Sequence, residues 1–119
     1  MTEPYRVSEA YWAAECRRDI DEVMTWYHPD ATYEDGGGLR RGTAEIRAAY
    51  EDSARAYPGL EVRIVREFTS SPDCSGLEFD ATLIDPAGTR FRVRGVNVVV
   101  VRDGRFVSVR SYEDQPTPE

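Results

Sequence analysis

The sequence FRVRGVNVVVVRDGRFVSVRSYED, residues 91–114, decides the fold. Apolar and polar side chains alternate along it, and Asp103-Gly104 in its middle is a two-residue signal for a β-hairpin. We therefore expect a long strand over residues 89–102 and a final strand over residues 105–113. The C-terminal part of the chain is thus predicted to form an antiparallel sheet.

The two faces of the strand over 89–102 have different surroundings. Asn97 shares one face with Phe91, Val93 and Val99, and this apolar set should point toward the core. A buried amide needs hydrogen-bond partners or a ligand. The run Val98–Val101 is apolar on both faces, and the chain has no further helix to cover the outer one. We expect a second subunit to cover it, in a homodimer.

The N-terminal half shows helical periodicity. Tyr11 lies on the same helical face as Val7, Ala10 and Ala14, so it should point inward. Three helices before the strands indicate an α+β fold, in which the helices pack on a cone-shaped, curved antiparallel sheet (a cystatin-like roll). We expect one domain over residues 1–119. Its helices are predicted over 6–17, from a cap at Asp19 to a stop near His28-Pro29, and from Thr43 to Pro58-Gly59. Short strands at 31–35, 60–64 and 79–83 precede the hairpin, residues 36–42 form a flexible loop, and residues 115–119 form a mobile tail.

Composition excludes several classes of function. The formal net charge of -7 disfavours nucleic acid and anionic membranes as partners. The sequence has no apolar run of membrane-spanning length and no signal-peptide core, which predicts a cytoplasmic location. It has one histidine, two cysteines without ligand spacing and no phosphate-binding glycine loop. We therefore expect no metal and no cofactor.

Three residues on different expected elements could act together on a carbonyl compound. Asp35 offers a carboxylate, Tyr11 a hydroxyl and Asn97 an amide. A carboxylate can take a proton from a carbon beside a carbonyl, while neutral donors stabilise the oxygen that becomes negative. Asp35 could equally be a strand-end carboxylate bonded to the glycine loop, so the fold must bring the three together for this chemistry.

The chain resembles the nuclear transport factor 2-like superfamily, and within it the branch of ketosteroid isomerases and SnoaL-like polyketide cyclases. The resemblance covers roughly residues 6–114 and rests on WYHPDATYEDGGGLRRGTAEIRAAY, residues 26–50, and on the hairpin quoted above. These segments are typical of the fold, but the fold hosts many functions.

The resemblance to ketosteroid isomerase implies roles for individual residues. Asp35 falls at the position of the general base, and Tyr11 at that of the oxyanion-hole tyrosine. Tyr27 and Tyr50 match tyrosines that support the latter through a hydrogen-bond chain. Ketosteroid isomerase is the established example of an aspartate base that works with a tyrosine and a protonated aspartic acid as oxyanion donors, and the resemblance implies a similar division of roles in this chain.

Three positions depart from the ketosteroid isomerase pattern. Asn97 stands where that family has the protonated aspartic acid, and an amide donates at any pH. Gly36 replaces a proline after the base. Glu113 replaces a bulky aromatic wall residue, which makes the pocket more polar than a steroid site.

The resulting prediction is a cofactor-independent acid/base enzyme that isomerises or cyclises a small apolar carbonyl compound. Two alternatives stay open: a hydrolase or dehydratase in which Glu113 helps to activate water, and a non-enzymatic member that binds a small ligand or a protein. The predicted catalytic residues are Asp35, Tyr11 and Asn97, and the predicted substrate-binding residues are Tyr27, Tyr50, Phe79, Val99, Val109 and Glu113.

Overall fold

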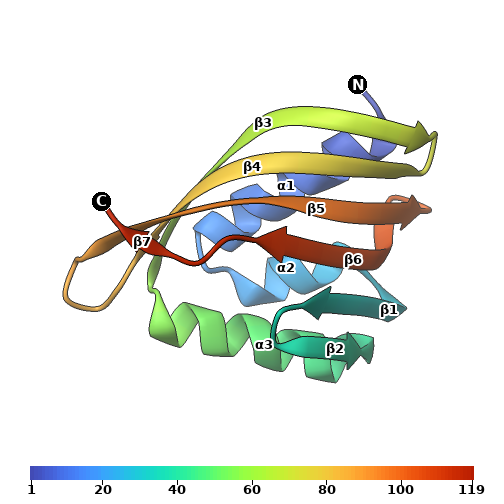
Figure 1. Cartoon of the computed structure of the whole chain (residues 1–119). Helices are drawn as coiled ribbons and strands as arrows, with labels where there is room; N and C mark the ends of the chain where they lie inside the picture. The colour runs from blue at the N-terminus through green and yellow to red at the C-terminus, as the bar shows by residue number, and fades with distance from the viewer.

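A computed structural model describes all residues 1–119 as three helices and one curved, unclosed sheet of seven strands (Figure 1). The α+β prediction is confirmed. The helices are α1 (Glu3–Cys16), α2 (Ile20–Thr25) and α3 (Gly42–Ala56); the strands are β1 (Tyr27–Asp35), β2 (Gly38–Arg41), β3 (Gly59–Ser71), β4 (Cys74–Ile84), β5 (Arg90–Arg102), β6 (Arg105–Glu113) and β7 (Thr117–Pro118).

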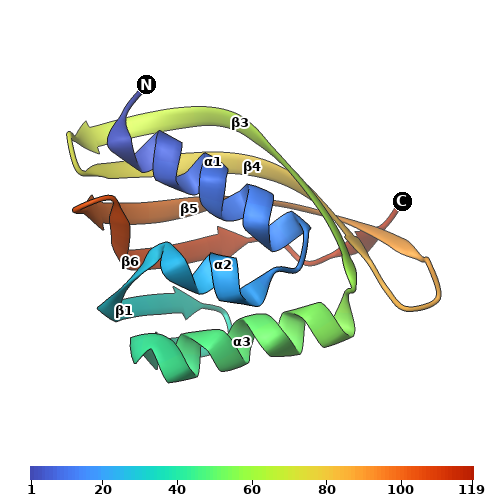
Figure 2. The same ribbon diagram turned by 180° about the vertical axis from the view of Figure 1, so that it is seen from behind.

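The sheet has the strand order β2-β1-β6-β5-β4-β3, and β7 adds to β5. All three helices lie on one face of the sheet, as the two opposite views show (Figures 1 and 2). The other strand pairs are antiparallel as expected, but β1 runs parallel to β6, so the sheet as a whole is mixed. These two strands are far apart in sequence and not joined by a hairpin, so nothing in the connection forces them to run in opposite directions.

Side-chain caps explain where two of the helices begin. Thr2 precedes α1, and its hydroxyl accepts a hydrogen bond of 3.1 Å from the Tyr5 amide. Asp19 precedes α2 and accepts one of 3.1 Å from the Glu22 amide, as its sequence pattern predicts. The predicted Thr43 cap of α3 is wrong. That helix follows Arg41, which makes no side-chain cap hydrogen bond.

The second helix is shorter than predicted, and β1 is longer. The Phe106 amide donates to the Trp26 carbonyl at 2.8 Å, and Tyr27 pairs with Phe106, so β1 starts directly after α2. Pro29 lies inside β1 although it has no amide hydrogen to donate. The register of the β1–β6 pairing shifts between Tyr27 and Thr32, and Pro29 falls in this irregular stretch.

Other segments are also more ordered than the sequence suggests. Four of the seven residues in the expected flexible loop form β2, which pairs with the end of β1. Strands β3 and β4 extend well beyond the short alternating cores at 60–64 and 79–83. Within the tail that is expected to be mobile, Thr117 and Pro118 pair with Arg92 and Phe91. No helix has both the length and the apolar character needed to cross a membrane, and the predicted compartment stays a prediction.

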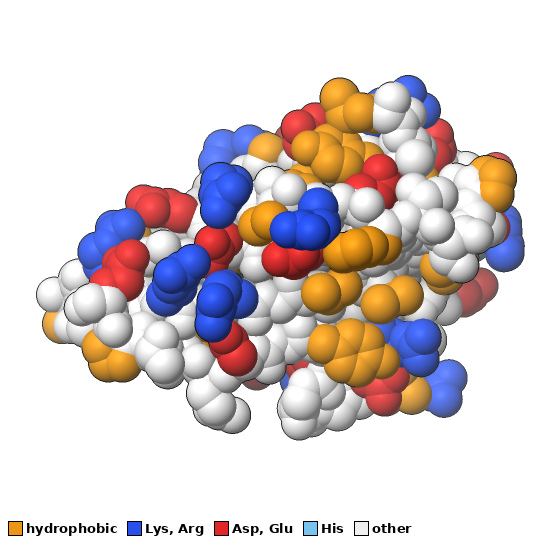
Figure 3. Space-filling view, turned by 45° about the horizontal axis from the view of Figure 1, so that its top comes forward, with side chains coloured by type: hydrophobic (Ala, Val, Ile, Leu, Met, Phe, Trp, Pro, Cys, Tyr) orange, Lys and Arg blue, Asp and Glu red, His pale blue; other side chains and the backbone are white.

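The two faces of β5 differ as the alternation predicts. Asn97, Val99 and Val101 are buried toward the helices, whereas Val96 and Val98 on the outer face are only half-buried. The core between sheet and helices consists of eighteen buried apolar residues. The outer face is uncovered, and Figure 3 shows apolar side chains gathered on one part of it beside a zone of alternating basic and acidic ones.

Candidate active site

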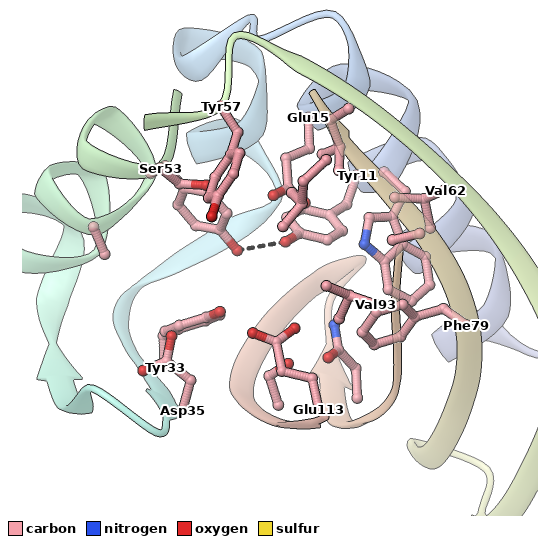
Figure 4. Close-up of a pocket in the computed structure, with 18 of the residues that line it drawn as sticks. Tyr11, Glu15, Tyr33, Asp35, Ser53, Tyr57, Val62, Phe79, Val93 and Glu113 are labelled. Atoms are coloured by element: carbon pink, nitrogen blue, oxygen red, sulfur yellow. Dashed lines mark hydrogen bonds between the residues drawn. The ribbon is translucent and has the colours of Figure 1, made fainter. Parts of the chain in front are cut away.

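A cavity of about 250 Å³ lies between the helices and the inner face of the sheet. Tyr11 reaches it from α1, Asp35 from the end of β1 and Asn97 from the middle of β5, so the fold brings the three predicted residues to one cavity. Its other lining residues are mostly apolar or aromatic (Figure 4): Trp12, Glu15, Tyr33, Arg40, Ala49, Tyr50, Ser53, Tyr57, Leu60, Val62, Phe79, Ala81, Leu83, Val93, Ser111, Glu113 and Pro116.

Three tyrosines form a chain of hydrogen bonds that ends at the cavity. The hydroxyl of Tyr50 lies 2.6 Å from that of Tyr11 and 2.6 Å from that of Tyr27. Burial, followed by the Glu15 carboxylate, raises the pKa of Tyr11 well above its ordinary value of 10.0. Tyr11 therefore keeps its proton at neutral pH and can donate it in a hydrogen bond to a ligand. When it does so, Tyr50 can donate to Tyr11 and Tyr27 to Tyr50.

Asn97 is a buried amide without a protein partner. Only 5% of its surface is exposed, and its Oδ1 atom has no hydrogen bond. It is held in position by the regular pairing of β5 with β4 and β6, where it lies opposite Leu77 and Ser111. A buried amide without a partner is uncommon in folded proteins, and here it faces a cavity that a ligand could fill.

Asp35 lies at the mouth of the cavity and is fixed by two donors. Its Oδ1 atom accepts a hydrogen bond of 2.8 Å from the Gly37 amide and another from the Arg40 guanidinium. The same guanidinium lies 5.9 Å from the ring centroid of Tyr33. Both donors contact Oδ1, so Oδ2 is left for a substrate. The loop-bonded and cavity-lining interpretations of Asp35 are therefore compatible.

Two further carboxylates line the cavity. Glu15 is 13% exposed and lies 3.8 Å from Arg18. Burial raises its pKa, and its interactions with Tyr11 and Arg18 only partly oppose this effect. Glu113 points into the cavity on the side of Tyr33 (Figure 4). Its side chain is exposed at the mouth, yet loss of water contact, followed by the Asp35 carboxylate, raises its pKa.

The sequence interpretation missed Glu15. The residue comes four positions after Tyr11 on α1, and side chains at this spacing lie on the same face of a helix. The prediction that Tyr11 points inward could therefore have indicated that Glu15 points inward as well. Tyr33 and Tyr57 were also missed as parts of the cavity wall. No three His, Cys, Asp or Glu side chains lie close enough together to hold a metal ion.

The predicted substrate-binding residues divide into two groups. Tyr50, Phe79 and Glu113 line the cavity. The other three do not line it, contrary to the prediction. Tyr27 lies behind Tyr50, at the far end of the hydroxyl chain. Val99 and Val109 lie opposite one another in the β5–β6 pairing and are 0% and 1% exposed, which makes them core residues.

Comparison with known families agrees with this architecture. The family model described as SnoaL-like domain matches residues 8–109. The chain belongs to the SnoaL-like domain family. None of the curated proteins compared with this SnoaL-like chain matches it significantly.

Solved structures similar to this SnoaL-like protein include three with differently named activities. A Δ5-3-ketosteroid isomerase from Mycobacterium sp. is 23% identical with a TM-score of 0.82, and the match covers 94% of this chain and 93% of that one. An LEH-like epoxide hydrolase from Mycobacterium tuberculosis is 27% identical with a TM-score of 0.80, covering 94% and 83%. A putative polyketide cyclase from Sinorhizobium meliloti is 18% identical with a TM-score of 0.76, covering 89% and 93%.

Proposed function

We propose that this protein is a cofactor-independent enzyme that moves a proton on a carbon beside the carbonyl group of a small, mostly apolar compound. The observation that carries the proposal is the Tyr27–Tyr50–Tyr11 chain of hydroxyl groups, which ends at the cavity that also receives Asp35 and Asn97. Donors fixed in a site with little water can stabilise a developing oxyanion by about 3 kcal/mol each.

In the proposed reaction, the substrate carbonyl oxygen binds Tyr11 and the Asn97 amide nitrogen. Oδ2 of Asp35 takes the α-proton, and the electrons of the C–H bond move into the carbonyl to form an enolate. Isomerisation follows if the proton returns to another carbon of the conjugated system. Cyclisation follows if the enolate carbon attacks a second carbonyl of the same molecule, and the new alkoxide then takes the proton. Both outcomes use the same three residues.

A second candidate is a hydrolase or dehydratase on the same scaffold. The observation in its favour is Glu113, a carboxylate at the mouth with a raised pKa and no hydrogen bond or ion pair to the protein. A carboxyl of this kind can hold a proton closer to neutral pH and exchange it with water or a leaving group. In this reaction, Asp35 and Glu113 would work as a pair across the mouth.

The outer face of the sheet supports a homodimer. Val96, Val98 and Val100 are half-buried there, and their cross-strand neighbourhood includes Phe68, 55% exposed, and Tyr112, 56% exposed. These five residues form the valine patch. An exposed apolar surface of this kind is usual at a protein–protein interface, and a second copy would bury it (Figure 3).

Titration with phenols tests the proposed oxyanion site. A phenol mimics an enolate because it presents an acidic oxygen on an unsaturated carbon, and it should bind at Tyr11 and Asn97. Tyr11→Phe should weaken phenol binding about tenfold or more, since one donor to the bound oxygen is lost. Tyr112→Phe is the matched control, because Tyr112 lies on the outer face. Equal affinity of Tyr11→Phe and the parent would refute the assignment of Tyr11.

A further inference from the structure

The cavity holds more negative charge than the protein neutralises. It is lined by three carboxylates: Glu15, Asp35 and Glu113. Glu15 lies 3.8 Å from Arg18, and Asp35 binds Arg40. Glu113 forms no ion pair and no hydrogen bond, although its side chain points into the cavity on the side of Tyr33 (Figure 4). One carboxylate is therefore left for a cation that the protein does not supply.

The region outside the mouth is acidic as well. A second hollow of about 540 Å³ shares Asp35 and Glu113 with the cavity. Its lining adds Glu34 and Asp114, whereas Arg110 is its only basic residue. A funnel lined by one sign of charge raises the local concentration of ligands of the opposite sign and repels those of the same sign. A substrate with a carboxylate or phosphate group is therefore disfavoured on the path to Tyr11.

The inner wall is suited to a positively charged nitrogen. Six aromatic side chains line the cavity, and aromatic faces attract organic cations. Asn97 provides a separate indication, because its Oδ1 is buried and has no donor to bind. A protonated amine offers an N–H to this oxygen and a positive charge to Glu113, whereas a simple ketone offers neither. The aromatic residues are Tyr11, Trp12, Tyr33, Tyr50, Tyr57 and Phe79.

We propose that the ligand of this cavity is an amino-carbonyl compound, whose protonated amine is held by Glu113, the Asn97 oxygen and the aromatic wall. The inference rests on the proposed function for the carbonyl end and adds the chemical class of the rest of the substrate. It also accounts for Glu113 at a position where an aromatic wall residue is expected for a steroid site. The amine stays attached throughout, so the proton transfer at the α-carbon is unchanged.

Two ketones of the same shape test the inference. In 5-(dimethylamino)pentan-2-one the terminal group is a protonated amine at neutral pH, and in 6-methylheptan-2-one the nitrogen is replaced by a C–H carbon. Dissociation constants for both are measured by titration calorimetry or ligand NMR with the full chain at pH 7. We expect the amine to bind at least about tenfold more tightly, mainly because it alone carries a charge that the Glu113 carboxylate attracts.

Two variants locate the source of the preference. Glu113→Gln keeps the side-chain shape and removes the charge, so the amine and the neutral ketone should bind within about twofold of each other. Glu51→Gln is the matched control: this residue is exposed on α3, has no ion pair and does not line the cavity. It should keep the full preference. Because Glu113 lies at the exposed mouth and outside the core, its replacement leaves the packing of the fold intact.

The outcomes separate this inference from the proposed function. Equal or tighter binding of the neutral ketone overturns the inference, as does a preference that survives Glu113→Gln or an absence of measurable binding for both compounds. If the neutral ketone also exchanges its α-protons on the enzyme, the proposed function stands without the inference. If the amine is preferred but neither compound exchanges its α-protons faster than in buffer, the inference stands and the proposed function fails.

Discussion

The hydroxyl groups of Tyr11 and Tyr50 lie 2.6 Å apart, although the two residues come from different helices. Tyr50 binds Tyr27 at the same distance, so it is the central member of a buried chain. Of these three tyrosines, Tyr11 and Tyr50 line the cavity and Tyr27 does not. The arrangement makes Tyr11 the donor that would contact a ligand, and makes Tyr50 and Tyr27 supports that orient and polarise it.

The tyrosine chain predicts a graded loss of activity. Tyr11→Phe should reduce α-proton exchange in a bound ketone about a hundredfold, because it removes a donor to the oxyanion. Tyr50→Phe and Tyr27→Phe should have smaller effects in that order, since they act through Tyr11. Tyr50→Phe should also lower the free energy of unfolding by about 1–3 kcal/mol, because two buried hydroxyls lose their partner. Equal exchange rates for Tyr11→Phe and Tyr27→Phe would contradict the proposed order.

Glu15 predicts a specific dependence of stability on pH. Burial raises its folded-state pKa above the ordinary value of 4.5, so the folded chain keeps this proton to higher pH than the unfolded chain. The parent should lose this part of its stability as pH rises from 4.5 through the raised pKa. Glu15→Gln cannot ionise at this position. The free energy of unfolding of Glu15→Gln minus that of the parent should therefore increase as pH rises over the same range.

Urea unfolding from about pH 4.5 to about pH 8 measures this difference. The loss of the Glu15–Arg18 pair adds an offset, and only the trend with pH reports on the ionisation of Glu15. Glu51→Gln, on the exposed face of α3, serves as the control and should run parallel to the parent. If the Glu15→Gln curve also runs parallel to the parent, the Glu15 pKa is not raised in the folded state.

The valine patch predicts self-association. Val98→Glu places a charge in the middle of the patch and should convert a dimer of the parent chain into a monomer at micromolar concentration, as measured by sedimentation velocity. Thr82→Glu places the same charge on β4 opposite Arg92, in the zone of ionic side chains, and should leave the assembly intact. A parent protein that stays monomeric at high concentration would show that the patch is not a dimer interface.

The sequence predicts those parts of the site in which helix or strand periodicity fixes the direction of a side chain. The inward direction of Tyr11 follows from the helical spacing of Val7 and Ala14, and that of Asn97 from strand alternation. Glu15 was missed because a charged residue near a helix end ordinarily lies in water, and its burial depends on tertiary packing. The position of Asp35 at the mouth likewise depends on β2, whose four residues, Gly38–Arg41, are too few to show a strand pattern.

Some of the fold also could not be predicted, because it depends on contacts between segments that are distant in sequence. The parallel pairing of β1 with β6 joins distant segments, and no local pattern specifies it. Strand alternation directs Val99 and Val109 inward, but inward-facing residues fill either the core or the cavity, and these two fill the core.

The direct test of the proposed chemistry is deuterium exchange at the α-carbon of 6-methylheptan-2-one and related small ketones, followed by NMR, with Asp35→Asn as the variant. Asp35→Asn keeps the shape of the side chain and removes the base. Asp30→Asn is the matched control, since Asp30 lies on the same strand and is exposed. The account predicts that the parent and Asp30→Asn accelerate exchange, and that Asp35→Asn is slower by at least about a hundredfold. Exchange in Asp35→Asn as fast as in the parent would contradict the account.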